Sequence, residues 1–273
     1  MRILALETTD KTGSVAAMAD DNLLAELMLD HTQRSAQSLA PAIDRLLKQV
    51  GWLPSDVQLV AVSIGPGSFT GLRVGVTAAK VFAYAVGAEV LGVNTLEVIA
   101  ANCAATQSNE ISVVIDAQRG EVVVQSFVRQ ADGWFEPAGA EELLDADVWL
   151  ARLKANASSV SPLPLGEGPG VRACPRTQQD SDLQNAASPH PDPLPKGDGT
   201  VVTGPGLARL LDRLPPGIEA LDQDCWRPRA ASVGRLAARH HAQGRRDDLW
   251  RLVPHYYRCS AAEEKWDARM AKQ

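Results

Sequence analysis

A glycine-rich stretch between an apolar run and a helical run constrains this chain more than any other feature. Residues 59–62 are Leu-Val-Ala-Val, and residues 65–75 read Gly-Pro-Gly-Ser-Phe-Thr-Gly-Leu-Arg-Val-Gly. A strand that ends in a glycine turn and enters a helix presents backbone N–H groups and the positive end of the helix dipole to an anion. The spacing lacks the lysine of a P-loop and is not the GxGxxG dinucleotide pattern. It predicts a strand, a turn and a helix, and leaves phosphate binding at the turn as one open interpretation.

The predicted helix carries small residues along one face, because Gly71, Gly75 and Ala79 recur at i, i+4 and i+8. Glycine inside a helix costs about 1 kcal/mol relative to alanine, so two glycines indicate a packing reason. One interpretation is close approach to the sheet or to the helix predicted at residues 35–50. The other, which we favour, is a partner interface made of Gly71, Val74, Gly75, Ala78, Ala79 and Phe82.

Strand and helix patterns occur in two successive units. Each unit opens with strand-like runs, at residues 3–7, 14–18 and 24–29 in the first and at residues 111–116 and 121–128 in the second. Helical patterns follow the strands in both units. We therefore expect an α/β protein of two lobes, each with a mixed sheet flanked by helices. The expected lobes are residues 1–105, which carry the partner interface, and residues 106–273.

The stretch from residue 158 to residue 200 differs in composition from the rest of the chain. It holds eight of the chain's 17 prolines and almost no periodic aliphatic residues. Such a segment buries too little apolar surface to offset the entropy cost of ordering it. We predict a disordered insertion in the second lobe, and a docking segment for another protein is the functional alternative.

Composition excludes several classes of protein. The net charge of −6 over 273 residues does not favour nucleic-acid binding over the whole surface. The four cysteines form no CxxC pair, so neither a zinc ribbon nor a disulfide scaffold is predicted. Residues 1–7 run into a strand pattern rather than a signal peptide, and no apolar run has the ~18 residues of a membrane helix. We expect a cytoplasmic protein that does not bind membranes.

Several motifs together resemble one protein family. Beside the glycine-rich stretch, the matching segments are Met-Arg-Ile-Leu-Ala-Leu-Glu-Thr at 1–8, His-Thr-Gln-Arg at 31–34, Ile-Asp-Ala-Gln-Arg-Gly-Glu-Val at 115–122 and Pro-His-Tyr-Tyr-Arg at 254–258. In this combination the chain resembles the TsaB (YeaZ-type) family, the non-catalytic subunit of the bacterial system that makes threonylcarbamoyladenosine on tRNA. Gln118 and Val123 depart from the family's usual arginine and tyrosine, and the family does not usually carry the insertion.

The resemblance implies a fold of the actin, Hsp70 and sugar-kinase type, with two lobes of ribonuclease-H-like topology. It implies binding to the catalytic paralogue TsaD and to the ATPase TsaE, with tRNA reached through the complex. TsaD transfers threonylcarbamoyl to the adenosine beside the anticodon of tRNAs that read ANN codons. The resemblance also places helix pairs from both partners in one intersubunit bundle, and a homodimer is the open alternative when the chain is alone.

The positions that match the metal ligands of the catalytic paralogue carry other residues here. TsaD uses a His-x3-His pair on a helix, where residues at i and i+4 share a face. The matching residues of this chain are Thr95 and Ile99. We therefore predict no metal site, no catalytic residue and no cofactor of the chain's own, so that ATP and metal belong to the partner subunits.

Two groups of residues are candidates for nucleotide binding at the positions that this fold uses. They are Thr8, Thr9, Gly65, Gly67 and Ser68 in the first lobe, and Gly204 and Gly206 in the second. Glu7 and Asp116 stand where kinases and ATPases of the fold have acidic residues, but no Asp-x-Gly-x-x-Thr pattern begins at Asp116. The alternative, which we favour for Glu7 and Asp116, is that they end strands and anchor turns.

Eight arginines lie between residues 227 and 258. Such a local excess of positive charge can contact tRNA phosphates. It can equally form a solvated helix face or pair with the acidic remainder of the chain, which we favour.

The main hypothesis is therefore a scaffold subunit that dimerises with TsaD, orders its active site and helps to recruit TsaE. Its rival is an autonomous ATPase or small-molecule kinase of the same fold that uses Glu7 and the glycine turns. A third hypothesis is a metallopeptidase, which the absence of the His-x3-His pair disfavours.

Overall fold

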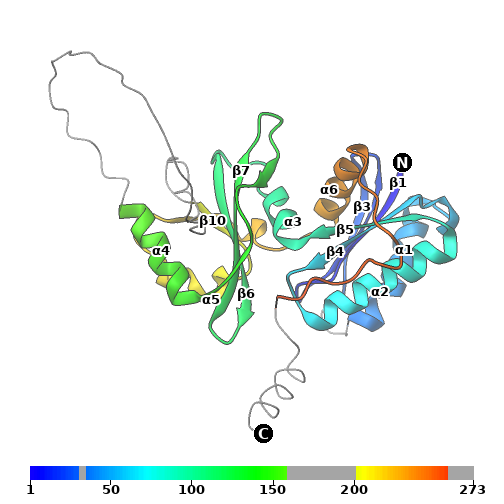
Figure 1. The fold of residues 1–273 in the computed structure, drawn as a ribbon. Coiled ribbons are helices and arrows are strands. Elements are labelled where there is room, and N and C mark those ends of the chain that lie inside the picture. The colour runs from blue at the N-terminus through cyan, green and yellow to red at the C-terminus, as the bar shows by residue number, and fades with distance from the viewer. Residues whose placement is uncertain (31–34, 159–200, 258–273) are drawn as a thin grey trace, which may run out of the picture.

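The computed structural model describes residues 1–30, 35–158 and 201–257. These residues form two lobes (Figure 1). The first sheet is built from β1 (Arg2–Glu7), β2 (Ser14–Ala19), β3 (Asn22–Met28), β4 (Leu59–Gly65) and β5 (Glu89–Asn94). The second is built from β6 (Glu110–Gln118), β7 (Glu121–Arg129), β8 (Phe135–Pro137), β9 (Glu142–Asp145), β10 (Val201–Thr203) and β11 (Glu219–Ala220). The helices are α1 (Ser35–Val50), α2 (Phe69–Val86), α3 (Thr95–Asn102), α4 (Ala146–Ser158), α5 (Leu207–Leu210) and α6 (Ala230–Ala242).

Two parts of the sequence interpretation fall outside these residues. The insertion predicted at residues 158–200 lies beyond the described part except for Ser158, which ends α4. The family segment at residues 31–34 also lies outside it.

The first sheet has the strand order β3-β2-β1-β4-β5. Its central strand β1 pairs antiparallel with β2 and parallel with β4, and β5 continues the parallel side. This order and direction are those of a ribonuclease-H-like lobe, as the resemblance implies.

The second sheet repeats this arrangement with the order β11-β10-β6-β7-β8, and β9 also pairs with β7. Strand β6 takes the place of β1, because it is antiparallel to β7 and parallel to β10. The predicted fold, two lobes with duplicated mixed sheets of the actin and sugar-kinase type, is therefore confirmed.

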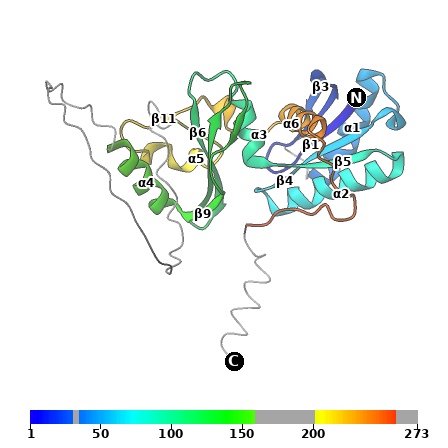
Figure 2. The ribbon, with the colours of Figure 1, turned by 45° about the horizontal axis from the view of Figure 1, so that its top comes forward.

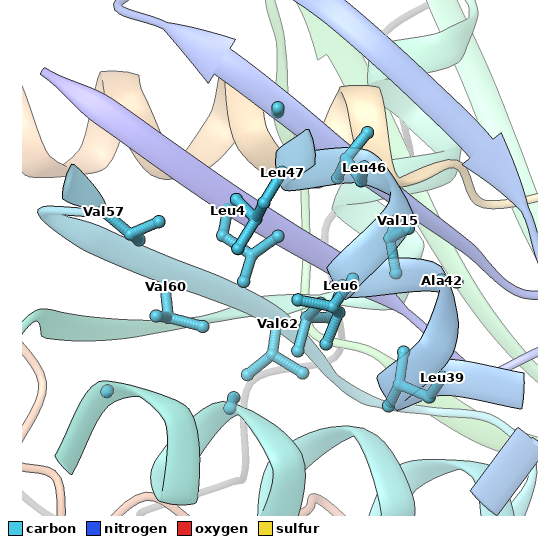
Figure 3. Packing of buried hydrophobic residues seen from close by; sticks show 14 of the residues in the cluster. Leu4, Leu6, Val15, Leu39, Ala42, Leu46, Leu47, Val57, Val60 and Val62 are labelled. Carbon is cyan, nitrogen blue, oxygen red and sulfur yellow. The ribbon is translucent and has the colours of Figure 1, made fainter. Parts of the chain in front are cut away.

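Strand β1 is buried on both faces, as expected of an unbroken apolar run in a covered sheet. Leu4 and Leu6 pack under α1 and α2 (Figure 3). Ile3 and Ala5 point to the opposite face and pack against α6. Two helices therefore cover one face of the first sheet, and the other face depends on a helix from the end of the chain.

Helix α6 belongs by its packing to the first lobe. Val233 and Ala237 are fully buried against the first sheet. A Cβ at Gly234 would lie 2.3 Å from the Met18 sulfur, so the helix approaches the sheet very closely. The chain then pairs with β5 at Asp247 and runs alongside α2, where Lys80 donates to the carbonyl oxygens of Trp250 and Leu252 (Figures 1 and 2). The assignment of everything after residue 105 to the second lobe is corrected here, because α6 supplies the apolar cover that the first sheet needs.

Strand β9 and helix α4 divide residues 142–158 between them. Leu143 pairs with Val123 in strand β9, and α4 begins only at Ala146. An apolar pair such as Leu143-Leu144 suits a strand or a helix, and pairing with β7 decides between them.

Candidate functional site

The small-residue stripe of α2 faces the first sheet. A Cβ at Gly71 would lie 1.9 Å from the Thr8 carbonyl oxygen, and one at Gly75 would lie 2.2 Å from Thr8 Oγ1. The Thr8 hydroxyl donates to the carbonyl oxygen of Gly71 at 2.8 Å, and Ala79 is fully buried. The stripe lets α2 lie directly against the end of β1. The expectation that Gly71, Gly75 and Ala79 form a partner surface is therefore wrong.

The neighbouring face of α2 borders an apolar groove of about 870 Å³. Val74, Ala78 and Phe82, the other three predicted interface residues, line this groove and remain partly exposed. Their role in binding a partner stays a prediction, but their position permits it. The opposite wall and the end of the groove come from α1 and the residues after it, namely Leu39, Ala40, Ile43, Asp44, Leu47, Lys48, Trp52, Leu53 and Pro54.

Two large apolar side chains of the groove are mostly exposed, Val81 at 63% and Leu53 at 66%. Exposed apolar surface that is continuous with a groove typically marks a site of protein binding. Charged groups stand at the margins, where Lys48 pairs with Asp44 at 2.8 Å. The groove can therefore accept an apolar helix face with polar flanks.

The α1 wall of the groove is not among the site residues that the sequence predicts. The signal was present, since Leu39, Ile43 and Leu47 recur at i, i+4 and i+8. This spacing predicts the helix at residues 35–50, but it does not show which neighbour the apolar face of that helix meets. Trp52 and Leu53 follow the helix and carry no periodic signal at all.

The Gly65-Pro66-Gly67 turn packs against the chain's own backbone. A Cβ at Gly65 would lie 2.5 Å from the His255 carbonyl oxygen, and one at Gly67 would lie 2.8 Å from the Thr9 carbonyl oxygen. The Ser68 N–H donates to the Thr9 carbonyl oxygen at 2.8 Å. The turn thus fixes the start of α2, and protein atoms occupy the space beside it. The first-lobe nucleotide candidates do come together, because Thr8 and Thr9 lie against Gly67, Ser68 and Gly71.

The Glu7 carboxylate is fully buried at the end of β1. One oxygen accepts hydrogen bonds from the Thr9 N–H and hydroxyl, both at 2.5 Å, and the other accepts one from the Ser63 hydroxyl. Burial raises the pKa of Glu7 above its ordinary value, although the hydrogen bonds from Ser63 and Thr9 lower it in part. This carboxyl group ties β1 to β4 and to the following turn.

We expect Glu7→Gln to reduce the pH dependence of stability. Because the pKa of Glu7 is raised in the folded state, the folded chain keeps a proton that the unfolded chain loses. The free energy of unfolding therefore falls as the pH rises above about 4.5, the ordinary pKa that Glu7 has in the unfolded chain. Glutamine does not titrate, and its amide can donate to Ser63 while its oxygen accepts from Thr9. Urea unfolding between about pH 4.5 and pH 7 checks this; equal slopes for variant and wild type would contradict it.

The second-lobe glycines lie at a close approach of two strands. Gly204 has φ +117°, and a Cβ there would lie 2.3 Å from the Val114 carbonyl oxygen. The N–H of Gly206 donates to the same oxygen at 3.0 Å. Nearby, Asp116 forms an ion pair with Arg209 at 2.8 Å. These contacts explain both glycines by packing, and nucleotide binding at them stays a prediction.

The positions compared with metal ligands are core positions. Thr95 and Ile99 on α3 are both buried. Among the residues that the structure describes, no three His, Cys, Asp or Glu side chains are grouped as metal ligands. Two histidines of α6 lie beside single carboxylates: His240 Nε2 is 3.8 Å from an oxygen of Glu97, and His241 Nε2 is 2.5 Å from an oxygen of Glu89. Burial, Arg245 and Arg239 lower the pKa of His240.

Most of the C-terminal arginines are used in ion pairs within the chain. The pairs are Arg227 with Asp10, Arg229 with Glu26, Arg239 with Asp132 and Glu136, Arg245 with Asp247, and Arg246 with Glu89. Arg258 lies outside the described residues. The geometry therefore favours pairing with the acidic remainder of the chain over a phosphate-binding patch. Among the described residues no helix is long and apolar enough to span a membrane.

Comparison with known proteins gives matches of three kinds. The family model described as "TsaD: tRNA N6-adenosine threonylcarbamoyltransferase" matches residues 29–156. Proteins named tRNA threonylcarbamoyladenosine biosynthesis protein TsaB are similar in sequence. The one from Bacillus subtilis is 32% identical over 154 residues, 56% of this chain and 66% of that protein. The one from Escherichia coli is 30% identical over 158 residues, 56% of this chain and 67% of that protein.

The matched region thus spans about two thirds of the length of these relatives. Among solved structures, YeaZ from Pseudomonas aeruginosa superimposes with a TM-score of 0.66 at 24% identity and covers 93% of this chain and 99% of its own. At that level of identity the likeness concerns the fold.

Proposed function

Since the chain belongs to the TsaB family of tRNA threonylcarbamoyladenosine biosynthesis proteins, we propose that it is a non-catalytic subunit that binds a TsaD-like partner. The observation that carries this proposal is the apolar groove between α1 and α2. Binding there orders the partner's active site and helps to recruit a TsaE-like ATPase. In this role the chain reaches tRNA only through the complex.

The groove exposes apolar surface that a partner can cover. Its walls are apolar side chains of two adjacent helices, with Val81 and Leu53 open to solvent. Each Å² of apolar surface covered by a partner contributes about 25 cal/mol. Two helices from the partner would complete a packed bundle with α1 and α2. A second copy of this chain offers the same groove, so self-association is the competing use of the surface.

The geometry of the first-lobe glycine turn supports a role without catalysis. An ATPase or kinase mechanism would need the Glu7 carboxylate to face a metal-bound water or substrate. Both of its oxygens instead accept hydrogen bonds from Thr9 and Ser63. His255 and Thr9 pack where a phosphate would approach the turn.

Mixing the purified chain with a TsaD-like protein tests the proposal. We expect a 1:1 complex in size-exclusion chromatography with light scattering. We also expect ATP turnover by the chain alone to stay at background. Turnover by the chain alone that disappears in Glu7→Gln would support the enzyme alternative, and failure to form any complex would contradict the proposal.

A further inference from the structure

In the part of the chain that the structure describes, two segments carry the backbone between the lobes, and a cysteine lies in each. The chain passes from the first lobe to the second through α3, which Cys103 caps at its C-terminal end, and continues into β6. It returns between β11 and α6 through a short 3₁₀ helix, Gln223–Cys225. Figure 1 shows α3 between the two sheets. Both cysteines therefore belong to segments that join the lobes.

The two cysteine side chains lie in the same small space. Thr203 contacts both residues, because its Oγ1 lies 3.8 Å from Cys103 Sγ and donates to the carbonyl oxygen of Cys225 at 3.3 Å. Cys225 Sγ lies 3.9 Å from the carbonyl oxygen of Asn102, the residue bonded to Cys103. Both cysteines pack in the apolar cluster between α3 and the second sheet, and their thiols hydrogen-bond to each other. The two sulfur atoms are therefore neighbours.

The backbone around the two thiols is held in place. Asn102 Nδ2 donates to the carbonyl oxygen of Arg227 at 2.5 Å, which ties the end of α3 to the returning segment. The Arg129 guanidinium donates to the carbonyl oxygens of Cys103 at 3.5 Å and Thr106 at 2.8 Å. A disulfide requires cysteines that are already neighbours in the fold, since bridging distant ones would move the backbone. The junction of the lobes meets this requirement.

We propose that Cys103 and Cys225 form a reversible disulfide when the chain meets a peroxide, and that this bond locks the two lobes at their junction. Hydrogen peroxide first oxidises the Cys225 thiolate: an S–O bond forms, the O–O bond breaks, and hydroxide leaves. The Cys103 sulfur then attacks the sulfenic acid and expels water. In total, two thiols and one peroxide give one disulfide and two waters. A dithiol reductant reverses the step by exchange. The proposal goes beyond the proposed function and does not depend on it.

Exposure and charge set the order and the rate of the two steps. Cys225 is partly exposed and Cys103 is buried, so peroxide reaches Cys225 first. Burial raises the pKa of Cys103 to about 12, which Arg129 offsets only in part. Burial raises the pKa of Cys225 too, and Asp222 and Asp224 add to the shift. Because the thiolate is the reactive form, oxidation is slow near neutral pH, and its rate rises about tenfold per pH unit.

The test uses a full-length chain in which Cys174→Ser and Cys259→Ser leave only the two junction cysteines. After treatment with hydrogen peroxide and unfolding in guanidinium chloride, we expect both free thiols to be lost and the mass to fall by about 2 Da. The product should be a monomer, and tryptic digestion should give one peptide pair joined through Cys103 and Cys225. Dithiothreitol should restore both thiols. The rate should rise about tenfold between pH 7 and pH 8.

The lock itself has a separate readout. Hydrogen exchange of the backbone amides at residues 103–109 and 221–229 should be at least about threefold slower in the oxidised chain, because opening the junction would then work against a covalent bond. In Cys225→Ser, and in Cys103→Ser as a second variant, peroxide should leave this exchange unchanged.

Three results would overturn the proposal. The first is that both thiols survive peroxide, so that the two cysteines serve only as small apolar residues in this cluster. The second is that the two-cysteine chain gains oxygen, about 16 or 32 Da, or forms linked dimers instead of the internal bond. The third is that the disulfide forms but leaves exchange at the junction unchanged, which overturns the lock.

Discussion

Ala78→Glu is expected to abolish binding of the TsaD-like partner while the chain stays folded. Ala78 lies in the wall of the groove and is partly exposed, so a carboxylate there stays hydrated in the free chain. A partner that covers the groove would bury that charge without a counter-ion. We expect a loss of at least about 3 kcal/mol, which is more than about 100-fold in affinity.

The matched control is Val148→Glu. Val148 is an exposed apolar residue on a helix, at 47% exposure, but it lies on α4 of the second lobe. Its substitution should leave the affinity within about twofold. Titration calorimetry gives both affinities, and circular dichroism shows whether each variant is folded. Equal affinities for wild type and Ala78→Glu would place the partner elsewhere on the chain.

Gly71→Ala is expected to have the largest effect on stability of any single methyl group added to α2. The new Cβ would lie 1.9 Å from the Thr8 carbonyl oxygen, far inside contact distance, and the obstacle is backbone that cannot rotate away. Either α2 moves off β1 or the turn after β1 distorts. We expect a loss of about 3 kcal/mol or more, and a melting temperature lower by roughly 6–12 °C.

Gly139→Ala is the matched control, because no atom lies within 4 Å of a Cβ at that position and its φ is not left-handed. Its stability should change by no more than about 0.5 kcal/mol. Differential scanning calorimetry measures both variants. If Gly71→Ala kept its stability and lost only partner binding, the stripe would be an interface after all.

The sequence predicted most of the first lobe because its signals are local. Apolar runs such as Ile3 to Leu6 and the helical spacing of Leu39, Ile43 and Leu47 do not depend on distant contacts. Distant contacts do decide which neighbour the small residues of a helix face. Gly71 and Gly75 suit a neighbouring helix or a neighbouring strand equally well, and only the approach of Thr8 decides for the strand.

Only the α2 side of the groove could be predicted, because the other side depends on contacts between segments that are distant in sequence. Val74, Ala78 and Phe82 share a face of α2, which periodicity shows. That Trp52 and Leu53 complete the surface depends on how the chain leaves α1. The return of α6 to the first sheet is likewise non-local, because more than a hundred residues separate it in sequence from β5.

Threonylcarbamoyl transfer to tRNA, reconstituted with a TsaD-like and a TsaE-like protein, tests the central claim most directly. The wild-type chain, Glu7→Gln and Val148→Glu should all support transfer, since neither substitution alters the groove and the proposed role assigns no catalytic group to this chain. Ala78→Glu should leave transfer at the level seen without the chain. Full activity with Ala78→Glu, or complete loss with a folded Glu7→Gln that still binds the partner, would contradict a non-catalytic subunit that acts through this groove.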